Sequence, residues 1–161
     1  MAIFQFAFVI ESQMGLTNAV REAARRTVAT TTKNPDWTTL RTWTQEQLIG
    51  DGSNVGLLAQ NVQAYDPAQL WAAPYPGKSN TSSPDVTFCS YSAAGITNYR
   101  VKIAVEYKHP VFFGILAFAT DFVDGTTNDR WDLYASAEMR MENVDSAMVS
   151  AAGNDPPVCA P

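Results

Sequence analysis

The chain has 161 residues, of which 46% are hydrophobic and 17% are charged, and it carries a formal net charge of −5. This length suits a single domain with a core large enough to fold without a metal ion. Nucleic-acid binders carry a basic surface that neutralises phosphates, and the local basic cluster here is limited to Arg21, Arg25 and Arg26. We therefore expect no nucleic-acid partner.

Residues 3–30 are predicted to form one long helix, because no proline interrupts them and Gly15 is their only glycine. The helix changes character along its length. Up to Ile10 it is almost entirely apolar, interrupted by Gln5, whereas after Glu11 the apolar residues recur at a spacing near 3.6. A helix that is apolar on all sides is buried or in lipid, and an amphipathic helix lies on a core.

The bulky residues of the first turns are candidates for a helix-packing or anchoring surface: Phe4, Phe6, Phe8 and Ile10. The segment around them has no polar face to keep in water, which favours contact with other subunits or with a membrane over simple burial in the core. A spanning helix needs about 20 apolar residues, so this run is interpreted as the end of a truncated membrane or packing helix.

Shorter elements are predicted in the middle of the chain. Asp36 is a plausible N-cap, or Pro35 a first helical residue, for an amphipathic helix over residues 37–49. Residues 55–64 are predicted to form another short helix. Residues 74–84 contain three prolines, a glycine and four Ser or Thr residues, which predicts a long exposed loop.

Period-two alternation predicts antiparallel strands at residues 85–88, 99–108 and 131–142. The second and third of these carry charges of both signs on their polar faces, which allows cross-strand pairs if the two strands are neighbours. The apolar run over residues 111–122 is either a helix or a buried strand.

Together these elements predict an α+β fold, in which the second half of the long N-terminal helix packs on a small antiparallel sheet of three to four strands. The helix occupies residues 1–30, the α+β head residues 31–145 and a small, proline-rich tail residues 146–161.

The two cysteines, Cys89 and Cys159, lack the spacing of zinc ligands. We expect a disulfide between them, because it would tie down an otherwise untethered tail, although two unpaired thiols are the alternative. Such a disulfide requires an oxidising compartment.

No residue is singled out for catalysis, for a cofactor or for a metal, and we expect a protein that is not an enzyme. His109 has no serine or cysteine nucleophile pattern near it and is interpreted as a surface or turn histidine. Four acidic residues surround a turn: Asp121, Asp124, Asp129 and Asp132. Calcium takes oxygen ligands, but this spacing differs from that of an EF-hand, which favours an ordinary acidic turn and leaves a cation site as the alternative.

The apolar start of the chain runs directly into Leu16-Thr17-Asn18-Ala19-Val20-Arg21-Glu22-Ala23-Ala24-Arg25. This segment resembles the TadE-like pseudopilins, whose apolar N-terminal helix leads into a pattern of the kind Leu-Thr-Asn-Ala-Ala-Arg-Glu-Gly-Ala-Arg. Residues 99–107 and 136–142 are similar to the closing hairpin-like region of that family.

The resemblance implies a structural pilin-like subunit of a tight-adherence pilus or secretion apparatus, anchored by its N-terminal helix in the bacterial cell envelope with the head extracytoplasmic. Its partners would be other pilin or pseudopilin subunits, met through that helix, and the cytoplasmic membrane if the full helix is present. The family motif is carried by Leu16, Thr17, Asn18, Ala19, Arg21, Glu22 and Arg25. The alternative function is a secreted adhesive or ligand-binding domain that uses the loop at residues 74–84.

Overall fold

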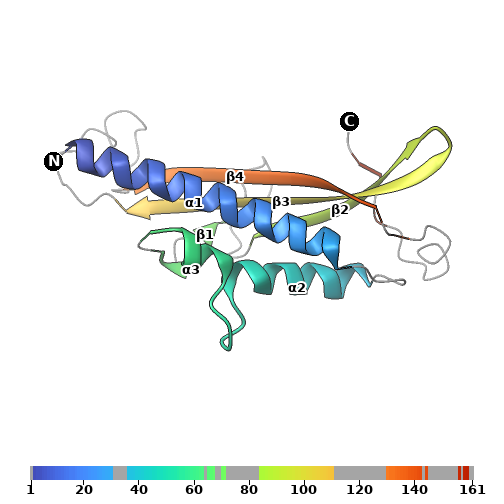
Figure 1. Ribbon diagram of the computed structural model, residues 1–161, viewed down its shortest axis with the longest axis horizontal. Helices are drawn as coiled ribbons and strands as arrows, with labels where there is room; N and C mark the ends of the chain where they lie inside the picture. The colour runs from blue at the N-terminus through green and yellow to red at the C-terminus, as the bar shows by residue number, and fades with distance from the viewer. Residues whose placement is uncertain are drawn as a thin grey trace.

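A computed structural model describes residues 2–30, 36–63, 65–67, 70–71, 84–110, 130–142, 144, 156 and 158–159. They form the expected α+β fold, in which one long helix lies along an antiparallel sheet (Figure 1). The helices are α1 (Ala2–Ala29), α2 (Trp37–Ile49) and α3 (Leu57–Asn61). The strands are β1 (Leu70–Trp71), β2 (Asp85–Ala93), β3 (Ile96–Pro110) and β4 (Arg130–Met141). The molecule is elongated, with the start of α1 at one end and the β2–β3 hairpin at the other (Figure 1).

Helix α1 confirms the predicted long N-terminal helix. Its second half buries a continuous face against the sheet, where it runs over β3 and β4. The fully buried residues of this face are Leu16, Ala19, Val20, Ala23 and Ala24. Because three of the five are alanines, the helix backbone can come close to the strands beneath it.

Helix α2 begins and ends where the sequence predicts. Asp36 is its N-cap, and a carboxylate oxygen of Asp36 accepts a hydrogen bond from the backbone N–H of Thr38 at 3.0 Å. A side-chain cap of this kind stabilises a helix by about 1 kcal/mol. Trp37 then packs its ring against Phe88 and Tyr99, with centroids 5.1 and 5.5 Å apart, which fixes the start of α2 on the sheet.

Helix α3 is shorter than the predicted segment at residues 55–64, and its end lies against α1. A Cβ atom on Gly15 would come within 1.9 Å of the backbone oxygen of Asn61. A side chain at this position of α1 is therefore incompatible with the observed approach of α3. The close packing of α3 on α1 therefore explains why a glycine occupies this position of the long helix.

Strand β3 is the centre of the sheet. It pairs with β2 and β1 along one edge and with β4 along the other, always antiparallel. Its alternation confirms the sequence prediction, since the side chains of Val101, Ile103, Val105 and Tyr107 are all fully buried on the side of α1. The two-residue strand β1 was not predicted.

The hairpin between β2 and β3 turns at Ala94 and Gly95, which both have positive φ angles, of 53° and 78°. Two such residues in a row are the geometry of a type I′ turn, which matches the twist of the strands on either side. The sequence prediction did not include this turn, because Ala94 is an unusual residue for it.

The opposite face of the sheet carries ion pairs between β3 and β4, as expected for neighbouring strands. Arg100 pairs with Glu138 at 2.7 Å, and Lys108 with Asp132 at 3.4 Å. Glu106 lies on this same face but is buried, although the alternation predicted an exposed position. Burial raises the pKa of Glu106 above its ordinary value, and the nearby charge of Asp132 adds to the effect.

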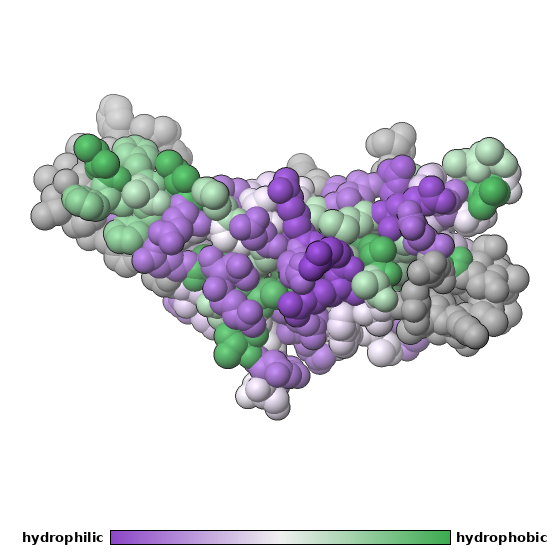
Figure 2. Space-filling model, in the orientation of Figure 1, coloured by the Kyte–Doolittle hydropathy of each residue, from purple (hydrophilic) through white to green (hydrophobic). Residues whose placement is uncertain are grey.

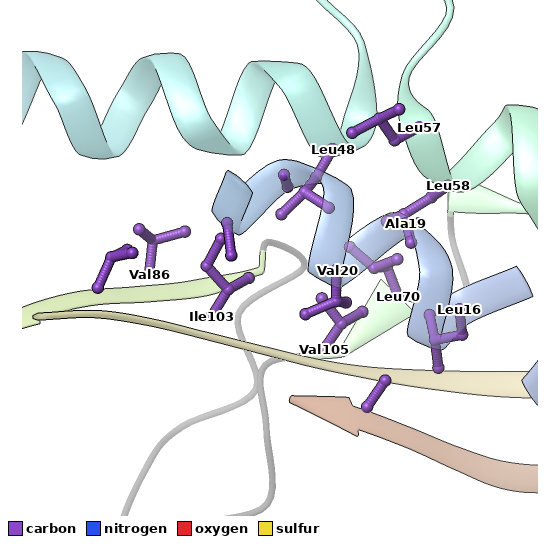
Figure 3. Close-up of a cluster of buried hydrophobic side chains, with 14 of the residues drawn as sticks. Leu16, Ala19, Val20, Leu48, Leu57, Leu58, Leu70, Val86, Ile103 and Val105 are labelled. Atoms are coloured by element: carbon purple, nitrogen blue, oxygen red, sulfur yellow. The ribbon is translucent and has the colours of Figure 1, made fainter. Parts of the chain in front are cut away.

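One hydrophobic core holds the helices and the sheet together. Side chains from α1, α2, α3 and the strands meet in it, and Figure 3 shows the central members. They include Leu16 and Val20 from α1, Leu48 from α2, Leu58 from α3 and Ile103 from β3. Helix α1 is therefore part of the globular fold and not only a stalk attached to it.

The C-terminal tail is tied to the edge of β2. Cys89 and Cys159 form a disulfide, with Cα atoms 4.8 Å apart, which confirms the predicted pair. The backbone N–H of Cys159 also donates to the carbonyl oxygen of Ser90 at 2.8 Å, and Val158 pairs in parallel with Ser90. Because the disulfide joins positions 70 residues apart, it contributes roughly 4 kcal/mol of stability by constraining the unfolded chain.

Three predicted features lie outside the described residues. They are the apolar run at 111–122, the loop at 74–84 except for its last residue, and the acidic turn except for Asp132.

Candidate functional site

The side of α1 that faces away from the sheet is apolar over its first half. Ile3, Phe4, Ile10 and Met14 keep 82%, 66%, 59% and 62% of their surface exposed, and Ala7 between them is also exposed. These five residues, called the apolar stripe below, recur at intervals of three and four residues and so share one side of the helix. Figure 2 shows hydrophobic surface at the end of the molecule where α1 begins.

The inward side of the same segment contains two polar residues. Gln5 and Ser12 are fully buried there, beside Val9. The Gln5 side-chain nitrogen donates to the carbonyl oxygen of Pro110 at 3.4 Å. This arrangement differs from the expected helix that is apolar on all sides, because its first half turns polar groups inward and bulky apolar groups outward. Burial of polar groups is unfavourable unless they are bonded, so the core alone does not account for this orientation.

The four residues predicted to anchor the helix lie in different environments. Phe4 and Ile10 belong to the apolar stripe. Phe6 is 47% exposed and meets Trp131 of β4 edge-on, with ring centroids 5.5 Å apart, whereas Phe8 is half-buried. Sequence reasoning missed Met14, although a rotation of about 100° per residue places it below Ile10 and on the same side.

Beyond Met14 the same side of α1 becomes polar and charged. Asn18, Arg21 and Arg25 are all exposed there, and Glu11 lies beside the apolar stripe. The outward surface of α1 therefore has an apolar first half and a basic second half. No helix in the described ranges combines the length and apolarity needed to cross a membrane.

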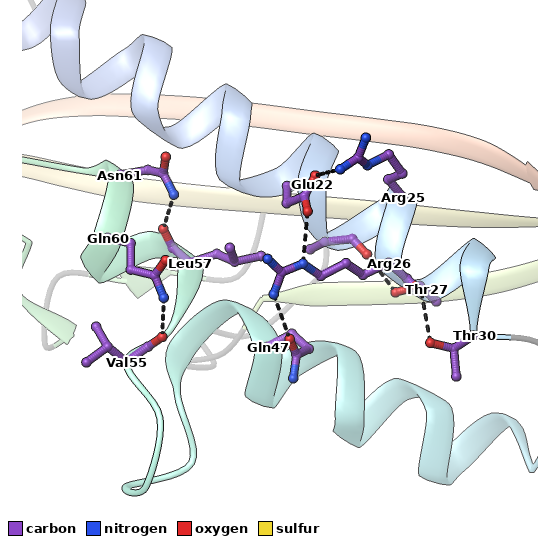
Figure 4. A network of polar contacts seen from close by, with 11 residues as sticks. Glu22, Arg25, Arg26, Thr27, Thr30, Gln47, Val55, Leu57, Gln60 and Asn61 are labelled. Atoms are coloured by element: carbon purple, nitrogen blue, oxygen red, sulfur yellow. Dashed lines mark hydrogen bonds and ion pairs between the residues drawn. The ribbon is translucent and has the colours of Figure 1, made fainter.

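Ion pairs within α1 organise the charged half (Figure 4). Glu22 meets Arg26 at 2.9 Å and Arg25 at 3.0 Å. Hydrogen bonds from Arg26, and then from Arg25, hold the pKa of Glu22 below its ordinary value. Arg26 also donates to the Gln47 side chain at 3.2 Å, which links α1 to α2.

Two shallow grooves follow this surface of α1. The first has a volume of about 550 Å³ and is lined by Ala7, Ile10, Glu11, Met14, Gly15, Asn18 and Asn61. The second has a volume of about 370 Å³ and is lined by Asn18, Arg21, Glu22, Arg25, Asn61 and Met139. The two grooves share Asn18 and Asn61 in their lining, and the lining changes from mainly apolar to charged along the helix.

The residues of the family motif are split between the two sides of α1. Leu16 and Ala19 are in the core, and Thr17 donates to the carbonyl oxygen of Gln13 one turn earlier at 2.8 Å. The remaining motif residues lie on the outward side: Asn18, Arg21, Glu22 and Arg25. The motif thus combines a packing role with a charged outer surface.

The sequence predicted a surface or turn position for His109, and the structure shows that this prediction is wrong. His109 lies in β3 and is fully buried, with its ring 6.3 Å from that of Tyr107 in an edge-on arrangement. The side chain faces the helix because it continues the inward alternation of β3. Burial lowers the pKa of His109 below its ordinary value.

The described residues contain no group of His, Cys, Asp or Glu side chains placed to hold a metal ion. Asp132, the part of the acidic turn that the structure describes, pairs with Lys108. The outward surface of α1 is therefore the candidate site that geometry supports best.

Comparison with models of protein families, with curated proteins and with solved structures finds no match for this chain. The resemblance to TadE-like pseudopilins is an expectation from the residues themselves. The functional argument is accordingly built on the surface of α1.

Proposed function

We propose that this chain is a structural, pilin-like subunit that assembles with copies of itself or with related subunits through the apolar stripe of α1. In this proposal the protein is not a catalyst. The α+β head projects from the assembly, and the acidic net charge keeps the exposed heads soluble.

The exposure of the apolar stripe is the observation that supports this role. Transfer of a large apolar side chain out of water stabilises a contact by about 1.5–3 kcal/mol. The stripe contains four such side chains: Ile3, Phe4, Ile10 and Met14. Their burial against a partner helix would therefore contribute several kcal/mol, which offsets part of the entropy lost on association. A segment that buries Gln5 and Ser12 while it exposes these apolar side chains is suited to this use.

The compartment that the proposal requires is consistent with the cysteine chemistry. Disulfides persist in oxidising compartments such as the periplasm or the cell surface, and Cys89 and Cys159 form one. An oxidising compartment supports the proposal that the head lies outside the cytoplasmic membrane of a bacterial cell envelope. The membrane itself is the second partner that the TadE resemblance implies for this end of α1.

The experiment compares two isoleucine substitutions that differ in location. Ile10→Glu places a charge in the apolar stripe, and Ile96→Glu places the same charge at the β2–β3 hairpin, where the isoleucine is 65% exposed. Sedimentation velocity over a concentration series measures self-association, and electron microscopy shows any filaments. We expect Ile10→Glu to lose association and Ile96→Glu to retain it.

An equal loss in both variants, or no loss in either, would count against assembly through α1. Flotation with phosphatidylglycerol vesicles separates lipid contact from self-association. Binding to vesicles without self-association would assign the apolar stripe to the membrane alone.

A further inference from the structure

The outward side of α1 contains two parallel rows of residues. The first row contains Phe4 and Glu11, and the second contains Met14 and Arg21, so that the members of each row are seven residues apart. All four side chains are exposed. Corresponding members of the two rows are ten residues apart, which rotates one row from the other by about 80° and displaces it by about 15 Å along the axis.

Corresponding members of the two rows have complementary chemistry. Phe4 and Met14 are apolar, and an aromatic ring and a thioether attract each other. Glu11 and Arg21 have opposite charges, and within the described part of the chain neither takes part in an ion pair. Arg25, which lies one turn beyond Arg21, adds to the positive charge of the second row.

We propose that α1 helices of neighbouring copies pack in parallel with an axial offset of about ten residues, so that Phe4 of one copy meets Met14 of the next and Glu11 meets Arg21. This arrangement rests on the proposed function and specifies its geometry. Phe4 then enters the first groove, which Ile10 and Met14 help to line. Glu11 enters the second groove, which Arg21 and Arg25 line.

Other arrangements of two α1 helices do not satisfy both pairs. A parallel arrangement without offset places Glu11 against Glu11 and Arg21 against Arg21, and like charges repel. An antiparallel arrangement that joins Glu11 to Arg21 moves Phe4 past the end of the apolar stripe, toward residue 28. The offset parallel arrangement is the one in which apolar and ionic contacts form together.

The two rows also allow each copy to contact two neighbours. The first row is used toward one neighbour and the second row toward the other, at different heights and on sides that differ by about 80°. The contact is therefore heterologous, and a heterologous contact that does not close into a ring extends into a filament.

Charge reversal tests the ionic pair. Glu11→Arg brings a second guanidinium against Arg21, and Arg21→Glu brings a second carboxylate against Glu11, so each variant alone places like charges together. We expect each to weaken self-association roughly threefold to fivefold at low ionic strength, as measured by sedimentation velocity. An equimolar mixture of the two variants restores association, because in an alternating assembly residue 11 of each copy again meets an opposite charge at residue 21 of the next copy. The double variant Glu11→Arg/Arg21→Glu restores association because it exchanges the two charges and keeps every pair opposite.

Failure of both the mixture and the double variant to recover would overturn the offset. If Ile10→Glu still abolished association in that case, assembly through α1 would stand and its geometry would be different. A wild-type chain that stayed monomeric throughout would overturn both proposals.

Cysteine substitution provides an independent measurement. The variant with Glu11→Cys and Arg21→Cys is expected to form a ladder of covalent multimers on oxidation. A variant with Glu11→Cys and Ser136→Cys, whose second thiol is exposed on the far face of the sheet, should not. Efficient dimers of Glu11→Cys alone would indicate helices packed without offset and would contradict the proposal.

Discussion

The two halves of α1 have opposite relations to the protein core. The second half follows the usual rule, with Leu16 and Val20 inside and Arg21 outside. The first half reverses it, with Gln5 inside and Ile10 outside. One continuous helix therefore serves two purposes: its second half holds the fold together, and its first half presents a surface to a partner.

The largest expected effect is the difference in stability between two truncations, one of a buried apolar side chain in the second half and one of an exposed apolar side chain in the first half. Leu16→Ala removes fully buried methyl groups and leaves a cavity, so we expect the free energy of unfolding to fall by about 2–5 kcal/mol. Ile10→Ala removes an exposed side chain and should change stability by less than about 0.5 kcal/mol while weakening association. Urea unfolding followed by circular dichroism measures the free energy of unfolding of both variants. Similar losses of stability in both variants would remove the distinction between the halves.

A smaller effect is expected at the junction of the halves. Gly15→Ala introduces a Cβ atom that meets the backbone of Asn61, so α3 must shift away from α1. Overpacking of this kind typically costs about 1–3 kcal/mol. The matched control is Asn18→Ala on the outward side of α1, which improves helix propensity and should leave stability unchanged or slightly higher. Equal stability of the two variants would show that the close contact with α3 is unimportant.

The smallest effect is a selective loosening of the first half in mild acid. His109 is buried beside Trp131, which contacts Phe6, and burial depresses the pKa of His109 in the folded state. The neutral ring is therefore favoured by folding. Its contribution is present above the unfolded value of 6.5 and is lost as the pH falls through the depressed folded value.

Hydrogen exchange at a series of pH values measures this loosening along α1. Amide protection in the first half should fall before protection in the second half. A His109→Phe variant removes the titrating group and should lose this difference. Uniform loss of protection along α1, or the same difference in His109→Phe, would contradict the assignment to His109.

Local patterns predicted much of the fold. The absence of proline over residues 3–30 and the repeat of apolar residues predicted α1, and Asp36 predicted the start of α2. The period-two alternation of residues 99–108 predicted β3 and its inward face. These features depend on backbone preference and on the contrast between apolar and polar residues, both of which can be read from neighbours in the chain.

The features that escaped prediction depend on contacts between distant segments. Glu106 follows the polar alternation of β3, yet it is buried. The turn at Ala94 and Gly95 uses a residue with weak turn preference, and the register of β2 against β3 positions it. The candidate site was predicted in part, through Phe4 and Ile10, whereas Met14 and the groove beside it were missed.

The residues by themselves determined that α1 is helical, that its second half is amphipathic and that its first half is rich in apolar side chains. Only the tertiary structure decided which side of the first half faces outward. Almost every side of that segment is apolar, so hydrophobicity provides no contrast by which to orient it. Its orientation follows from the second half, because a continuous helix rotates by a constant angle per residue and the buried face of Leu16 and Val20 determines where every earlier side chain points.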